Sequence, residues 1–310
     1  MLTFAFLLDL FFGDPVYAWH PVRLMGRAIE SGEIFWRKVV RHEKIAGAIL
    51  ALALPVLVFG GMSWAVRGLE KIYFWAGFAA QVLGIYTAVS VRDLHTEGMR
   101  VYQSLKKQDL EGARKDVGRI VGRDTNTLSE EAIVCASVET IAESTMDGIV
   151  APLFYAALGG APLALAYKAV NTLDSMIGHR SNRYIHFGFA AAKQDELWNW
   201  IPARISYVVS AVAAIFAGGR KRAAWAVGWR YGAAAPYGNS AVPEATFAGA
   251  LGLELGGRST YQGRVVDHPV LGVPRKKADK EDIRESLKLM WVASWITLAV
   301  CLSIHGALNR

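Results

Sequence analysis

The chain has 310 residues, of which 53% are hydrophobic and 20% are charged, and its formal net charge is +7. This composition, with a mean hydropathy of +0.24, is too apolar for a typical soluble enzyme and favours a membrane protein with positively charged loops. Binding of an anionic substrate is also compatible with the charge. The basic residues are scattered among apolar stretches, which argues against a nucleic-acid partner.

The first residues form a short apolar segment, 1–12, that is too short to cross a membrane alone. It carries Asp9 and lacks both a basic leading region and a small-residue cleavage site, so it does not resemble a signal peptide. The sequence Gly13-Asp14-Pro15 then predicts a break in the helix. His20 and Pro21 follow, and a basic amphipathic stretch continues to Lys44.

Five apolar segments are long enough to enter a membrane, and the first would form a helix of roughly 33 Å, close to the thickness of the hydrocarbon core. Pro55 should kink that helix, which forms a transmembrane hairpin with the second segment. The third contains Pro152, Gly159-Gly160 and Pro162, which indicates a discontinuous or re-entrant element. The segments lie near 45–66, 72–91, 146–166, 201–217 and 287–304.

Two polar segments, 92–130 and 218–286, lie between these spans. The first has the periodicity of amphipathic surface helices, and Ser129 is a candidate N-cap for the helix that follows. Because the strand signal is weak throughout, we predict an all-α, polytopic membrane protein with a single domain over 1–310. A count of five crossings puts 92–144 and 168–200 on opposite sides, which is why a re-entrant element is favoured.

Three carboxylates, Glu139, Glu143 and Asp147, recur every four residues in an apolar helical stretch. This spacing predicts that they share one helix face, where they repel one another unless a cation or a proton intervenes. Carboxylate oxygens are ligands for Mg²⁺, so a metal site for a phosphate-bearing substrate is one interpretation. The alternative is a solvent-facing acidic region near a helix N-terminus.

A second polar group follows, in which Asn171, Asp174 and Ser175 share a helix face and Asp195 and Asn199 are four residues apart. These residues either extend the site or act as caps and turn residues. The basic residues Lys168, Arg180, Arg183 and Arg204 either hold phosphates or flank the membrane. His20, His179 and His186 lack a metal-ligand spacing, and no P-loop, GxSxG or HExxH motif is present.

From the residues alone, the chain is predicted to be a membrane protein with a carboxylate- and amide-rich site for Mg²⁺ and phosphate chemistry. Several of its motifs also resemble one family, the cobalamin-biosynthesis membrane proteins CbiB/CobD, or adenosylcobinamide-phosphate synthases. The matching motifs occur in the same order from residue 9 to about residue 263. They are DLFFGDP, ETIAESTMDGIVAPLFY, KAVNTLDSMIGH, FGFAAAKQDELWNWIPAR and PEATFAGALGLELGG.

The resemblance implies an integral protein of the cytoplasmic membrane with ATP and Mg²⁺ as co-substrate and cofactor. It implies amide ligation of adenosylcobyric acid with aminopropanol or aminopropanol phosphate. The lipid bilayer and other nucleotide-loop assembly enzymes are further expected partners. An acyl phosphate intermediate would activate the carboxylate, and His20 or a carboxylate would deprotonate the amine.

On this resemblance the expected catalytic residues are His20, Asp14, Asp174 and Asp195, and the expected metal ligands are Glu139, Glu143 and Asp147. The expected residues for ATP and substrate are Lys168, Asn171, Ser175, Asn199, Arg204, Asn239 and Glu244.

Two departures from the family pattern concern Asn199 and the loop at Asn239. Asn199 lies in the Trp-rich DELWNW, where an Asp-Asp or Asp-Glu pair is expected and Glu196 supplies the second acid. That loop reads Tyr-Gly-Asn-Ser-Ala-Val-Pro-Glu, without the usual proline and glycine, so its backbone geometry is in question. Two other functional classes remain open. One is a Mg²⁺-dependent membrane prenyltransferase, and the other is a corrinoid-binding or transport protein without catalysis.

Overall fold

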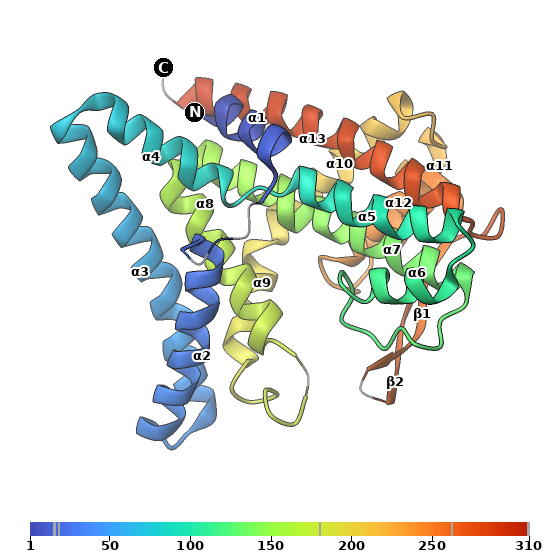
Figure 1. The fold of residues 1–310 in the computed structure, drawn as a ribbon, viewed down its shortest axis with the longest axis horizontal. Helices are drawn as coiled ribbons and strands as arrows, with labels where there is room; N and C mark the ends of the chain where they lie inside the picture. The colour runs from blue at the N-terminus through green and yellow to red at the C-terminus, as the bar shows by residue number, and fades with distance from the viewer. Residues whose placement is uncertain (15–16, 18, 180, 262, 309–310) are drawn as a thin grey trace. The chain divides into compact units, whose positions relative to one another are not determined.

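The computed structural model describes residues 1–14, 17, 19–179, 181–261 and 263–308, so Pro15 and Arg180 lie outside the described residues. The fold is predominantly helical, as predicted (Figure 1). The chain divides into two compact units, each assembled from segments that are distant in sequence. Neither unit is therefore a continuous stretch that composition would mark as a domain.

Unit 1 contains Met1–Ser90, Ala151–Trp200 and Leu298–Arg310. Its long helix α3 packs against α2, α4, α8 and α9, and α3 and α4 meet at Tyr73 to form the predicted hairpin. Apolar side chains on α3, including Leu52, Val56 and Trp64, are exposed as expected for a lipid-facing helix. The helices of this unit are α1 Leu2–Phe12, α2 Pro21–Val39, α3 Glu43–Ile72, α4 Phe74–Tyr86, α8 Ala151–Ile177 and α9 Phe189–Trp198.

Helix α8 is interrupted at Gly159 and Gly160, the position that the sequence marked for a break. Gly160 has a φ of 64°, which is a left-handed conformation that glycine adopts at little cost. The backbone N–H of Ala161 donates to Oε1 of Gln81 at 2.7 Å. An α4 side chain thus satisfies a backbone group exposed by the break, as a helix in an apolar environment requires.

Unit 2 contains Val91–Val150 and Ile201–Thr297. The predicted surface helices are present as α5 and α6, and Ser129 caps α7 by accepting a hydrogen bond from the Ala132 N–H at 3.2 Å. The first residue of α10 and the end of α13, from Leu298, are assigned to unit 1. The helical elements are α5 Val91–Lys106, α6 Leu110–Val117, α7 Glu130–Thr145, the π-helix η1 Met146–Val150, α10 Trp200–Phe216, α11 Lys221–Val227, the π-helix η2 Gly228–Ala233, α12 Ala241–Leu251 and α13 Lys280–Leu308.

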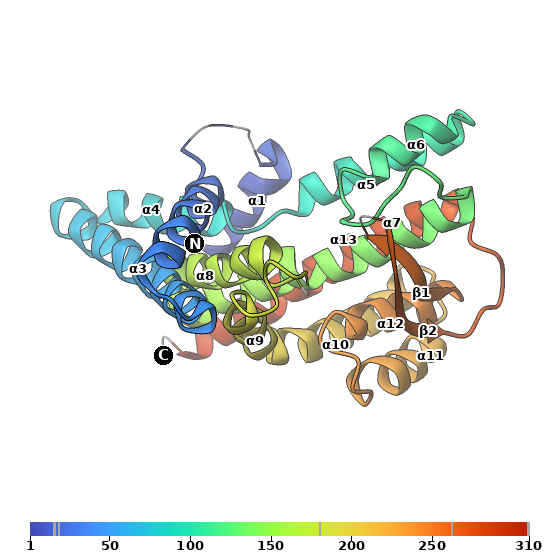
Figure 2. The same ribbon diagram turned by 90° about the horizontal axis from the view of Figure 1, so that it is seen from below.

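An antiparallel hairpin of β1 Glu254–Tyr261 and β2 Arg264–Gly272 also belongs to unit 2, and it is seen most clearly in Figure 2. The weak strand signal did not predict it, because glycines and Pro269 dilute the pattern of β-branched residues. Its register shifts between Leu255 and Gly257, where Gly256 has a φ of 84°. This bulge turns the backbone of β1 toward helix α7, which it contacts.

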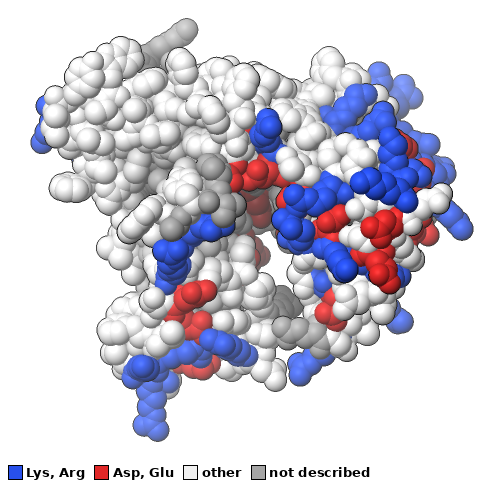
Figure 3. All heavy atoms as spheres, in the orientation of Figure 1, with Lys and Arg blue, Asp and Glu red and all other residues white. Residues whose placement is uncertain are grey.

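Among the described residues, four helical stretches are long and apolar enough to cross a membrane. A fifth arises if α9 and α10, which are bent by 45° relative to each other, form one span. In unit 1, the surface over α1 and α4 carries almost no charge, whereas charged side chains crowd the visible surface of unit 2 (Figure 3). The protein is a multi-pass membrane protein. Its long apolar stretches are Glu43–Ile72, Phe74–Lys106, Glu130–Ile177 and Lys280–Leu308.

Candidate functional site

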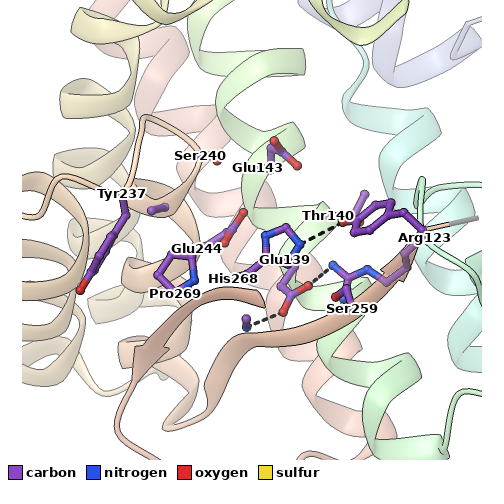
Figure 4. A pocket seen from close by; sticks show the side chains of 13 residues that line it. Arg123, Glu139, Thr140, Glu143, Tyr237, Ser240, Glu244, Ser259, His268 and Pro269 are labelled. Carbon is purple, nitrogen blue, oxygen red and sulfur yellow. Dashed lines mark hydrogen bonds and ion pairs between the residues drawn. The ribbon is translucent and has the colours of Figure 1, made fainter. Parts of the chain in front are cut away.

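A cavity of about 210 Å³ lies within unit 2, between α7, the segment that leads into α12, and the β1–β2 hairpin (Figure 4). It is rich in ionisable and hydroxyl side chains, and its three acids come from two helices. The residues that line it include Arg123, Glu139, Thr140, Glu143, Tyr237, Ser240, Glu244, Gly256, Ser259, Tyr261 and His268.

Glu139 is the most tightly held of these acids. Its Oε2 atom is ion-paired with the Arg123 guanidinium, and its Oε1 atom accepts a hydrogen bond of 2.7 Å from the backbone N–H of Gly256. The Glu139 and Arg123 side chains are only 7% and 18% exposed. Glu139 therefore connects α7 to the loop before it and to the hairpin, which is a structural role in addition to the predicted role as a metal ligand.

Glu143 and Glu244 are the other acids of the cavity, one from α7 and one from the first turn of α12. Burial raises the pKa of Glu244 well above the usual glutamate range, and the neighbouring Glu143 and Glu139 carboxylates raise it further, whereas Arg123 acts in the opposite direction. Three acids and one guanidinium therefore line the cavity, and the acids repel one another. A bound cation or the ammonium group of a substrate would relieve this repulsion.

Asp147 is absent from the lining, although the sequence predicted that it shares a face with Glu139 and Glu143. The physical reason is the π-helix over Met146–Val150, since its wider turn shifts the phase of the side chains that follow α7. Glu244 supplies the third acid instead. No group of three His, Cys, Asp or Glu side chains in the described part of the chain is arranged to hold a metal ion.

The donor set nevertheless fits Mg²⁺, which commonly uses one or two carboxylates and keeps several of its water ligands. Glu143 and Glu244, the two other acids of the lining, are the carboxylates that would hold the ion. The magnesium role of Glu139, Glu143 and Asp147 stays a prediction.

The structure brings together two further predicted residues of unit 2. Arg204, on α10, donates a hydrogen bond of 2.9 Å to Oδ1 of Asn239, in the loop before α12. The contact fixes the Asn239 side chain despite the changed sequence of this loop. An arginine held in place by an amide is suited to binding a phosphate.

In unit 1, Asp14 and His20 form a close pair, with 2.7 Å between Asp14 Oδ1 and His20 Nε2. The His20 side chain is 3% exposed, whereas that of Asp14 is 40% exposed. The Tyr86 hydroxyl donates to the Gly13 carbonyl at 2.5 Å and so ties this turn to α4. The arrangement pairs a buried imidazole with an accessible carboxylate, and the catalytic roles of both residues stay a prediction.

A second network in unit 1 contains Asp195 and Asn199. The Tyr167 hydroxyl donates to Asn199 Oδ1 at 2.9 Å, and Asn199 Nδ2 donates to Asp195 Oδ2 at 2.9 Å. The Tyr167 ring stacks on that of Tyr155, with 5.1 Å between the ring centroids. Because the Asp195 carboxylate only accepts hydrogen bonds, the Asn199 amide must turn its N–H groups to Asp195, which leaves its oxygen to accept from Tyr167.

The remaining predicted residues of unit 1 lie on α8. Ser175 donates its hydroxyl proton to the Asn171 carbonyl at 2.9 Å, a local contact within the helix. Asp174 lies beside Gly178, where any larger side chain would overlap the Asp174 carboxylate. Lys168 and Asn171 are half-buried. Since these residues and those of the cavity belong to different units, their predicted convergence on one site stays a prediction.

Sequence reasoning missed several residues of the cavity, among them Arg123, Gly256, Tyr261 and His268. Tyr261 and His268 face each other across the hairpin, with 3.3 Å between Tyr261 Oη and His268 Nε2. None of these four lies in an apolar segment, and Gly256 approaches Glu139 across 117 residues of sequence. Only a predicted hairpin that returned to α7 would have pointed to them.

Comparisons with known proteins extend over nearly the whole chain. The model of the family described as CobD/Cbib protein matches residues 2–290. The chain is 46% identical to the cobalamin biosynthesis protein CobD of Geobacter metallireducens over 290 residues, which is 93% of this chain and 91% of the relative. It is 40% identical to the cobalamin biosynthesis protein CbiB of Salmonella typhimurium over 311 aligned residues, which is 98% of this chain and 97% of the relative. No solved structure matches the chain.

Proposed function

The chain belongs to the CobD/CbiB family and has a role in cobalamin biosynthesis, and from this premise we propose that it is an ATP-dependent ligase. It joins a carboxylate of adenosylcobyric acid to the amine of aminopropanol, or of its O-phosphate, to give adenosylcobinamide or its phosphate. The single structural observation that supports this chemistry is the cavity in which Glu139, Glu143 and Glu244 meet Arg123. The enzyme works in the cytoplasmic membrane, alongside other enzymes of nucleotide-loop assembly.

The reaction has two steps, because a carboxylate is a poor electrophile. First, an oxygen of the corrinoid carboxylate attacks the γ-phosphorus of ATP, so that an acyl phosphate forms and ADP leaves. The amine nitrogen then attacks the acyl carbon, the C–N bond forms, and phosphate leaves. The substrate ammonium loses one proton before this attack and a second proton after it, and both pass to a base or to water.

The acids of the cavity have two roles in this scheme. Glu143 and Glu244 hold Mg²⁺, which when bound shields the phosphate charges. Glu139 keeps Arg123 in place at the cavity wall through their ion pair. Arg123 then offers N–H groups to a phosphate, for which a planar guanidinium is well suited.

The predicted residues outside the cavity have supporting roles. His20 is the expected base, and the Asp14 carboxylate, 2.7 Å from its Nε2 atom, would stabilise its imidazolium form. Arg204, held by Asn239, binds the phosphate of the amine substrate. The remaining expected residues for ATP and the corrinoid are Lys168, Asn171, Asp174, Ser175, Asp195 and Asn199.

A reconstitution experiment tests this function. The protein in lipid vesicles is given adenosylcobyric acid, the amine, ATP and Mg²⁺, and the corrinoid product and ADP are quantified by liquid chromatography and mass spectrometry. We expect one ADP per amide, and no product when any single component is omitted. With ¹⁸O in the corrinoid carboxylate, one labelled oxygen should appear in the released phosphate.

Three results would overturn the proposal. Amide formation without ADP release would exclude the acyl phosphate route. Tight corrinoid binding without turnover would favour a transport or binding protein. An isoprenoid product formed without ATP would indicate a prenyltransferase. Parallel assays with aminopropanol and its O-phosphate, compared by kcat/KM, identify the preferred amine.

A further inference from the structure

A group of basic residues in unit 2, away from the cavity, has no role in the proposed reaction. Arg220, Lys221 and Arg222 follow the end of α10, and Arg275 and Lys277 lie in the loop before α13, which itself carries Lys288. All six are exposed. None of them forms an ion pair with any residue that the structure describes. We call these six residues the basic cluster.

Backbone contacts hold the basic cluster together. The N–H of Arg220 donates to the Ala250 carbonyl at 2.8 Å, and the N–H of Arg275 donates to the Gly252 carbonyl at 2.9 Å. Gly252 has a φ of 73°, and a methyl group in place of its hydrogen would lie 3.2 Å from Arg220 Nε and 3.3 Å from Arg275 Cβ. Two arginines from separate segments therefore lie beside the same glycine.

A third cation reaches the same place from α13. A methyl group built on Gly218 would lie 3.8 Å from Lys288 Nζ, and Gly218 is only two residues before Arg220. Lys288 Nζ thus lies at the turn that joins α10 to α11, and Arg275 lies beside Arg220 at Gly252, the residue that ends α12. Three cations held together by the fold, with no acid paired to any of them among the described residues, favour an anionic ligand.

The basic cluster also lies where two apolar helices end. Helix α10 finishes at Phe216, which is 69% exposed, and the cluster begins four residues later. In α13, no charged residue follows Lys288 through Leu308. These are the positions at which apolar helices leave the hydrocarbon core for the headgroup region.

Aromatic residues next to the basic cluster point to the same interface. Trp225 and Trp229 are one helical turn apart and are 36% and 59% exposed, and both rings lie near that of Tyr207, at centroid distances of 5.2 and 6.4 Å. Tryptophan is enriched at the boundary between lipid and water. A site for a soluble phosphate needs no exposed indoles, whereas a lipid site does benefit from them.

We propose that the basic cluster is a binding site for the phosphate headgroup of an anionic phospholipid, with Arg220, Arg275 and Lys288 as its principal ligands. The phosphodiester accepts charge-assisted hydrogen bonds from these side chains. The acyl chains lie along the apolar ends of α10 and α13, and the indoles of Trp225 and Trp229 lie at the headgroup level.

Native mass spectrometry of the full-length protein in detergent tests the site, with phosphatidylglycerol and phosphatidylcholine as competing lipids. The wild-type protein should retain phosphatidylglycerol preferentially. Each of the substitutions Arg220→Gln, Arg275→Gln and Lys288→Gln should weaken that preference by about fivefold. The three substitutions are also combined in one triple variant. A matched triple control, which combines Lys107→Gln, Lys115→Gln and Arg264→Gln, removes the same charge elsewhere in unit 2.

The outcomes separate the alternatives. Loss of the preference in the triple variant of the basic cluster, with its retention in the control, supports the site. Equal loss in both triple variants would reduce the effect to net charge and overturn it. If millimolar inorganic phosphate displaces the lipid and binds by itself with the same dependence on the three residues, the site serves a soluble phosphate and the lipid assignment is wrong.

Discussion

The backbone N–H of Gly256 donates to Oε1 of Glu139 at 2.7 Å, and this contact fastens the β hairpin to helix α7. The other oxygen of the same carboxylate is ion-paired with Arg123. A charged side chain beside an apolar helix is costly unless its partners are fixed in place. Glu139 therefore shapes the cavity, whose other two acids are Glu143 and Glu244.

Replacing Glu139 with glutamine should destabilise unit 2. The change removes the ion pair and leaves the largely buried Arg123 guanidinium uncompensated, which costs about 3 kcal/mol when a buried pair is broken. Thermal unfolding in detergent should show a clear fall in Tm, and the Gly256 amide should exchange its hydrogen faster. Glu131→Gln, at an exposed position of the same helix, is the control and should change stability by less than about 0.5 kcal/mol. Unchanged protection of the Gly256 amide would contradict the contact.

Glu244 should make the stability of the protein depend on pH. Its pKa in the folded protein is raised above the ordinary value of 4.5. At a pH between the ordinary pKa and the raised pKa, the folded state therefore binds more protons than the unfolded state. Stability must then fall as the pH rises through this window. The neutral variant Glu244→Gln should lack this contribution.

The measurement is the Tm of both proteins from pH 5 to pH 9. We expect the difference between Glu244→Gln and the wild type to move in favour of the variant as the pH increases. Parallel curves over the whole range would show that burial and the neighbouring acids do not act on Glu244 as described.

The Tyr167→Phe substitution tests the network at Asn199 in unit 1. It removes the hydroxyl that donates to Asn199 Oδ1 and leaves a buried acceptor unpaired, which costs about 1–3 kcal/mol. The Tm should fall, whereas Tyr73→Phe, at an exposed position, should have no effect. In an Asn199→Ala background the Tyr167 effect should shrink by at least about 1 kcal/mol. Additive effects would mean that the two residues are not coupled.

Two glycines of helix α3 should respond in opposite ways to alanine. A methyl group on Gly47 would overlap the Phe187 carbonyl oxygen, whereas one on Gly60 meets no atom within 4 Å. Gly47→Ala should therefore destabilise unit 1 by at least about 1–3 kcal/mol. Gly60→Ala should be neutral or stabilising by up to about 1 kcal/mol, because alanine favours the helix. Size-exclusion chromatography and Tm measurements check both variants, and equal behaviour would contradict the packing of α3 against Phe187.

The helical fold and its apolar stretches followed from hydrophobic runs, which are local properties of the sequence. The break at Gly159-Gly160 and the Ser129 cap were predictable for the same reason. The cavity was not, because Glu139 and its partner Gly256 are separated by 117 residues. The π-helix after α7, which contains Asp147, was also not predictable, since a wider turn is invisible to periodicity.

The hairpin shows a second limit of sequence reasoning. Gly256, Gly257 and Gly263 make it look like a loop, yet the glycines are where the strands bulge and turn. The pairing of β1 with β2 and the contact of β1 with α7 supply the stability that the composition of the hairpin does not indicate. Arg123 remained unnoticed because it lies in the loop between α6 and α7 among other basic residues, from which no pattern distinguishes it.

The central claim is that the acids of the cavity serve ATP-dependent amide formation. The two single variants Glu143→Gln and Glu244→Gln test this claim most directly. Each variant is reconstituted in vesicles, and the initial rate of product formation from adenosylcobyric acid and the amine is compared with the wild type and with Glu131→Gln. We predict that both cavity variants fold normally and that their rates fall at least about 100-fold, whereas the rate of Glu131→Gln stays at the wild-type level. Near wild-type rates for both cavity variants would contradict the account.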